Sequence, residues 1–169
     1  NLMLQTKSSF SFCDLVLTRS DILTAMGYSD YQPDDDILDK IDSLLRLSAW
    51  YSNPSFGYKI CNGYYEKELL HIGDVCFDTG QIIHNSLKDC IQFAVFTVTA
   101  GIRFQEWMEN LNFWNDIVDR YIVDCIGSEI VEATANFMQK QLAEEYHQKE
   151  YGITNRYSPG YCGWNIKEQ

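Results

Sequence analysis

A long series of apolar residues at helical spacing constrains the fold of this chain more than any other feature. From Val118 to Leu142 these residues recur every three to five positions, and a 3.6-residue repeat brings such side chains onto one face of a helix. The residues from Ile102 to Leu111 show a similar spacing. The pattern therefore predicts two helices in this region, and we expect Gly152 to end the last one.

The first third of the chain contains recognisable start signals for helices. Phe10, Phe12 and the apolar residues 15–17 predict a first strand. The sequence from Thr18 to Asp21 has the form of a capping box, which predicts a short helix after it that Gly27 closes. Pro33 followed by three aspartates predicts a further helix, because carboxylates stabilise the positive end of the helix dipole.

Strand-like segments follow in the middle of the chain. Residues 52–80 are rich in β-forming residues, with turns expected at Asn53-Pro54, Asn62-Gly63 and Thr79-Gly80. A short helix is expected at 85–90, and the β-branched and aromatic segment 92–99 predicts a central strand with both faces covered. The expected fold class is α+β: one domain with a mixed or antiparallel twisted sheet and helices.

Composition excludes several classes of partner. With 169 residues and a net charge of −11, the chain lacks the basic surface that nucleic acid or an anionic membrane requires. No apolar run is long enough to cross a bilayer. Six cysteines without a C-x-x-C pair predict reduced thiols in a cytoplasmic protein, most of them packed in the core.

The segment from Arg156 to Trp164 combines residues that suit the binding of a small molecule. An arginine can meet a carboxylate with two parallel N–H donors, and Tyr161 can offer its ring face to a flat base or a cation. Pro159 holds Ser158 extended, and Gly160 lets the backbone approach a ligand. The same letters are also typical of an ordinary Pro-Gly turn with an exposed arginine. Cys162 is either a reactive thiol or, as we expect, a packing residue.

Three blocks of the sequence resemble the activation domain of vitamin B12-dependent methionine synthase. Residues 156–161 resemble its R-x-[AS]-P-G-Y signature, and Gly163, Trp164 and Gln169 are placed as in stand-alone relatives. Residues 124–133 resemble its D-a-i-G-S-x-x-v-E-a stretch, and residues 97–101 resemble the end of one of its strands. The resemblance extends from about residue 90 to residue 169 and is only topological before that.

The resemblance implies a site for S-adenosylmethionine. Its residues would be Glu132, Arg156, Ser158, Gly160 and Tyr161. Taken alone, Glu132 is an ordinary solvated residue on a polar helix face. A carboxylate and a guanidinium together would match the zwitterionic end of the ligand. Where full-length methionine synthases read Pro-Ala-Cys-Pro, this chain has residues 162–165 as Cys-Gly-Trp-Asn.

The resemblance also implies a cofactor and partners. In the family, the domain reactivates cobalamin oxidised to cob(II)alamin: a one-electron donor reduces the cobalt while S-adenosylmethionine supplies the methyl group. Residues 1–169 would form one such domain without the C-terminal part of the family domain, acting as an accessory module in methionine biosynthesis. Its partners would be a corrinoid-binding methyltransferase that holds the cobalamin and an electron-donor protein. The alternative is a non-catalytic binding or scaffolding subunit of a corrinoid protein complex.

Overall fold

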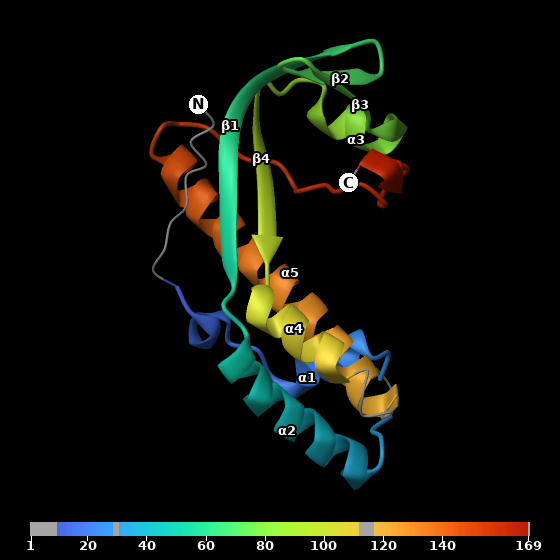
Figure 1. Ribbon diagram of the computed structural model, residues 1–169. Helices are drawn as coiled ribbons and strands as arrows, with labels where there is room; N and C mark the ends of the chain where they lie inside the picture. Colours follow the sequence, from blue (N-terminus) through green and yellow to red (C-terminus); the bar gives the residue numbers. More distant parts are fainter. Residues whose placement is uncertain (1–9, 29–30, 112–116, 169) are drawn as a thin grey trace. The chain divides into compact units, whose positions relative to one another are not determined.

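The computed structural model describes residues 10–28, 31–111 and 117–168 (Figure 1). It has an α+β fold in which a four-stranded antiparallel sheet is combined with five α-helices, as the sequence predicts. The strands are β1 (Ser55–Glu66), β2 (Leu69–Ile72), β3 (Val75–Asp78) and β4 (Gln92–Thr99); the helices are α1 (Arg19–Ala25), α2 (Asp35–Tyr51), α3 (Gly80–Leu87), α4 (Ile102–Leu111) and α5 (Ile117–His147), with 3-10 turns η1 (Phe12–Leu15) and η3 (Ile166–Glu168).

The described residues group into two compact units. The helical unit consists of residues 10–56 and Thr97–Met138, and the sheet unit consists of Gly57–Phe96 and the chain from Gln139 onward. The prediction that residues 1–169 act as one domain stays a prediction.

The helical unit is organised around an apolar core to which α5 contributes most. Its fully buried residues Ile122, Ile126 and Ile130 are four positions apart, which gives the buried stripe that the spacing predicts. The helices α2 and α4 lie side by side (Figure 1). Ile22, Ile41, Leu44 and Phe104 complete the centre of this core.

The helix starts predicted in this unit are confirmed, but the first strand is not. Thr18 and Asp21 form the expected capping box of α1, and α2 begins directly after Asp34. The prediction of a strand at 10–17 is wrong. Ser11 and Asp14 form a second capping box, which stabilises the start of the 3-10 turn η1. The backbone N–H of Ser11 donates to the Asp14 carboxylate at 2.6 Å. Phe10 instead stacks on Phe137, with 4.7 Å between ring centroids.

In the sheet unit the strand order is β3-β2-β1-β4. The register pairs Tyr64 with His71 and His71 with Cys76 across β1, β2 and β3. The bounds predicted for β4 are confirmed, but the prediction that it is a central strand with both faces covered is wrong. It lies at an end of the sheet, and most of its side chains are exposed. Its β-branched residues therefore reflect strand propensity rather than burial.

The prediction of a turn at Asn62-Gly63 is wrong, and the reason is steric. β1 runs straight through these residues to Glu66, and the hairpin turns at Lys67 and Glu68 instead. A Cβ at Gly63 would lie 2.7 Å from the His71 carbonyl oxygen and 2.8 Å from the Phe93 ring. Gly63 is therefore needed where a neighbouring strand and a buried ring come closest, and not for a turn.

Two other boundaries differ from the prediction. Thr79-Gly80 opens α3, so this helix spans Gly80–Leu87 rather than residues 85–90. The last α-helix ends at His147, before Gly152, because Glu150 takes the left-handed conformation and the Tyr151 N–H donates to the Tyr146 carbonyl.

The cysteines are less buried than predicted. All six are free; Cys125 is buried, Cys61 and Cys90 are half-buried, and Cys13, Cys76 and Cys162 are exposed. Burial is the main cause that raises the pKa of the Cys90 and Cys125 thiols. Among the described residues, no helix combines the length and the apolar character needed to cross a membrane.

We predict that Gly63→Ala destabilises the protein by about 1–3 kcal/mol, since the new methyl group must displace a backbone carbonyl or a buried ring. Urea denaturation measures this change. Gly152→Ala is the matched control, because a Cβ there meets nothing within 4 Å. An equal effect of the two substitutions would refute the steric role of Gly63.

Candidate functional site

The C-terminal loop, defined here as residues 156–168, begins with a tight turn at the Pro-Gly pair. The Tyr161 N–H donates to the Ser158 carbonyl at 3.3 Å, and Gly160 has φ 96°. Proline at the second position and a positive φ at the third define a type II turn. A Cβ at Gly160 would also lie 2.8 Å from the Ile166 side chain. Gly160 thus has a local structural role, and close approach to a ligand stays a prediction.

A second turn follows at once. Cys162 and Gly163 both have positive φ, 53° and 89°, and the Trp164 N–H donates to the Tyr161 carbonyl at 2.9 Å. This is the geometry of a type I′ turn. The Gly160 N–H donates to the Trp164 carbonyl at 2.8 Å, and this hydrogen bond links the first turn to the second.

This second turn explains the departure from full-length methionine synthases. Proline holds φ near −65°, so it could not occupy position 162 in this turn. The turn also leaves Cys162 exposed, so the expectation that this thiol packs against other residues is wrong.

The rest of the loop is fixed by Trp164. Its indole N–H donates to the Glu168 carboxylate at 2.7 Å, and its ring meets Phe77 of β3 edge to face at 5.8 Å. At the start of α3, a Cβ on Gly80 would lie 3.1 Å from the carbonyl carbon of Gly163. The loop is therefore held on β3 and on the first turn of α3.

Arg156 is held by a residue that the sequence analysis missed. The Gln139 side-chain carbonyl accepts a hydrogen bond from the Arg156 guanidinium at 2.7 Å. The Gln139 amide donates to the Thr154 carbonyl at 3.4 Å. A single glutamine of α5 thus contacts both the arginine and the backbone just before it. A glutamine on a polar helix face carries no sequence signal for such a role, and only the fold reveals it.

The predicted site residues of the loop differ in how far they are exposed to solvent. Ser158 is exposed, and Tyr161 is 70% accessible to solvent. Arg156 is half-buried, which limits its conformations and favours a directed interaction with an anion. Four of the five predicted site residues are therefore brought together in one hydrogen-bonded loop.

The fifth predicted site residue, Glu132, lies in the helical unit. It is exposed on α5. Its negative charge helps to raise the pKa of Glu129, after the larger effects of burial and of Asp21. Asp21 and Glu132 therefore both repel the charged form of Glu129, and a cation nearby would relieve that repulsion. Its role at the site stays a prediction.

An apolar depression in the sheet unit is formed by the end of α5 and the residues that follow it. It has a volume of about 350 Å³ and is lined by Ala143, Glu144, His147, Tyr151, Gly152 and Ile153. Gln139, Ala143 and His147 are four positions apart along α5, so they share one face of that helix. The chain that leads into the loop therefore runs back along this face.

No family model matches the chain, and no curated protein matches it. Among solved structures, the chain is similar to a crystal structure of the MetH reactivation domain bound to AdoHcy, with 12% identity and a TM-score of 0.55. The alignment covers 95% of this chain and 65% of that chain. The likeness is distant and shows a shared fold, in agreement with the fold that the sequence resemblance predicted.

We predict that Gln139→Ala loosens the loop around Arg156 without unfolding the protein, because the guanidinium loses its acceptor and Thr154 loses its donor. Trypsin should then cleave after Arg156 several-fold faster, as followed by mass spectrometry. Gln139→Glu keeps an acceptor for the guanidinium and should slow this cleavage again. Cleavage at the wild-type rate in Gln139→Ala would show that the glutamine does not hold the loop.

Proposed function

We propose that this protein binds S-adenosylmethionine and serves in the reductive remethylation of cob(II)alamin on a separate corrinoid-dependent methyltransferase such as a methionine synthase. One observation carries the proposal: the residues of the R-x-S-P-G-Y signature form an ordered loop in a fold similar to that of a reactivation domain bound to AdoHcy. AdoHcy is what remains when S-adenosylmethionine gives up its methyl group. The proposal extends that ligand chemistry to this chain.

The chemistry of the loop fits the ligand. Arg156 would bind the carboxylate of the methionine end, and the exposed Tyr161 ring would contact the flat adenine or the cationic sulfonium. Ser158 and the backbone at Gly160 would supply further polar contacts at the exposed turn. Glu132 would receive the ammonium group, in keeping with a cluster of carboxylates that a cation would stabilise.

The charge of the chain also favours this ligand. S-adenosylmethionine carries two positive groups and one negative group near neutral pH. A protein with a net charge of −11 attracts such a cation at long range, whereas it repels polyanions. The charge of the product AdoHcy is less positive by one unit, so its attraction to the site would be weaker after methyl transfer.

In this function the chain acts by positioning. S-adenosylmethionine supplies an activated methyl group on sulfur, an external donor supplies one electron to the cobalt, and AdoHcy is released. Holding the methyl donor in one orientation removes much of the entropic barrier, so no side chain needs to act as acid or base. The partner protein would hold the corrinoid. Because this chain has its own type I′ turn at 161–164, the face that meets the corrinoid would differ from that of full-length methionine synthases.

The first test is binding. We predict that S-adenosylmethionine binds and that Arg156→Ala weakens binding by about 1.5–3 kcal/mol, the range for a hydrogen bond to a charged group. Isothermal titration calorimetry measures the difference. Arg120→Ala removes an exposed arginine of α5 outside the loop and should leave the affinity unchanged. Equal affinity of wild type and Arg156→Ala would exclude Arg156 from the carboxylate site.

The second test is methyl transfer. With a reductant and S-adenosylmethionine, the isolated chain should methylate free cob(II)alamin negligibly, because binding to a protein partner is needed to align the two reactants. A cognate corrinoid protein should restore formation of methylcobalamin, followed by its visible absorption, at a rate that falls in Arg156→Ala. Tight binding of S-adenosylmethionine without methylation of any corrinoid protein of the source organism would favour the scaffolding alternative.

A further inference from the structure

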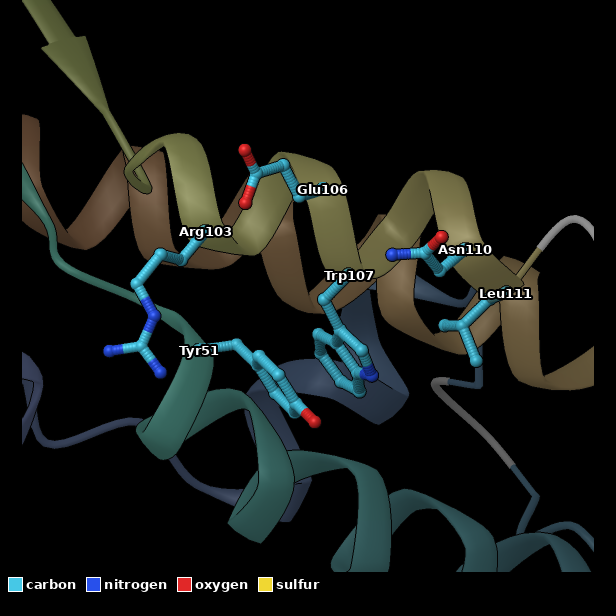
Figure 2. Close-up of a pocket in the computed structure, with 6 residues that line it drawn as sticks. All are labelled: Tyr51, Arg103, Glu106, Trp107, Asn110 and Leu111. Carbon is cyan, nitrogen blue, oxygen red and sulfur yellow. The ribbon is translucent and has the colours of Figure 1, made fainter.

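The helical unit has a pocket that the proposed function does not use. It lies between the end of α2 and one face of α4, has a volume of about 370 Å³, and is lined by Tyr51, Arg103, Glu106, Trp107, Asn110 and Leu111 (Figure 2). A volume of this size lies at the lower end of the range for small-molecule sites. The residues of α4 are three or four positions apart, so the helix repeat itself brings them to one face.

An aromatic wall gives the pocket a fixed shape. The rings of Tyr51 and Trp107 are stacked, with centroids 4.8 Å apart and planes inclined by 7°. The buried Phe104 meets the indole edge to face at 5.6 Å. Because packing holds Trp107 from two sides, its ring does not need to be ordered before a ligand contacts its accessible edge.

Two opposite charges line the same pocket without neutralising each other. Arg103 and Glu106 are one helical turn apart, yet neither side chain forms an ion pair or a hydrogen bond with any residue in the described parts of the chain. The Asn110 side chain likewise has no hydrogen-bond partner among those residues. In Figure 2, Arg103 and Asn110 lie on either side of Trp107 along α4, and the Arg103 side chain extends beside Tyr51.

The combination fits one class of ligand. In Figure 2 the Glu106 carboxylate points away from the Arg103 guanidinium. Both residues nevertheless line the pocket, and a guanidinium and a carboxylate can bind the carboxylate and ammonium groups that an α-amino acid carries on one carbon. Glu106 is exposed, so its carboxylate can turn toward an ammonium group without losing a contact within the protein. The stacked rings suit an aromatic side chain. A zwitterion has no net charge, so the net charge of −11 does not repel it.

We propose that this pocket binds a free α-amino acid with an aromatic side chain. Arg103 binds its carboxylate, Glu106 binds its ammonium group, and the Trp107 and Tyr51 rings contact its side chain. The site lies in the helical unit and shares no residue with the C-terminal loop. It also shares no residue with the proposed S-adenosylmethionine site.

The test uses L-phenylalanine as the probe, because it does not interfere with tryptophan fluorescence. We expect saturable binding with a Kd on the order of 1 mM or below, seen by calorimetry and by a change in tryptophan emission. 3-Phenylpropionate lacks the ammonium group and 2-phenylethylamine lacks the carboxylate. Each should bind about tenfold to a hundredfold more weakly, the cost of losing one charge-assisted pair.

Substitutions of the two charged residues test which group of the ligand each one binds. Glu106→Gln should weaken phenylalanine binding about tenfold or more and remove the preference over 3-phenylpropionate, whereas Arg103→Gln should remove the preference over 2-phenylethylamine. Glu109→Gln makes the same charge change on α4 outside the pocket and should have no effect. Lack of saturable phenylalanine binding, equal binding of the three probes, or equal weakening by Glu109→Gln would overturn the proposal. The proposal would also be overturned if the Trp107→Leu variant bound phenylalanine as tightly as the wild type.

Discussion

The burial of one face of α5 is the constraint on which the rest of the structure depends. Ile122, Ile126 and Ile130 are fully excluded from water, and each such side chain stabilises the fold by roughly 1.5–3 kcal/mol relative to exposure. The same helix later carries Gln139, which bonds the C-terminal loop. A single helix therefore contributes both to the main apolar core and to the anchoring of the candidate site.

The C-terminal loop shows how a short segment can be ordered without much burial. Its groups are mostly exposed, yet two consecutive turns, the indole of Trp164 and the amide of Gln139 satisfy many of its donors and acceptors. Such a loop loses little conformational entropy when it meets a ligand, which favours affinity. The ordinary-turn interpretation of the Pro-Gly pair and the binding interpretation are thus compatible, because the turn fixes the position of Tyr161 while Gln139 holds Arg156.

Local signals in the sequence were sufficient where they act through neighbouring residues. The Thr18 capping box, the aspartates before α2 and the apolar spacing of α5 identified those helices. Long-range effects were missed. Asn62-Gly63 has the letters of a turn, but contacts with His71 and Phe93, which only the folded sheet brings near, keep Gly63 inside a strand. For the same reason the sequence could place Arg156 in a loop but could not identify Gln139, seventeen residues earlier, as its acceptor.

The close approach of Gly80 to Gly163 has a consequence for how this protein can change. A side chain at Gly80 would collide with the backbone of the second turn, 3.1 Å away, while that turn itself depends on the positive φ of Gly163. Substitutions at the two positions should therefore be strongly non-additive, since once either one has displaced the loop the other has little contact left to disrupt. The start of α3 and the tip of the loop thus constrain each other's substitutions, although more than eighty residues separate them in the sequence.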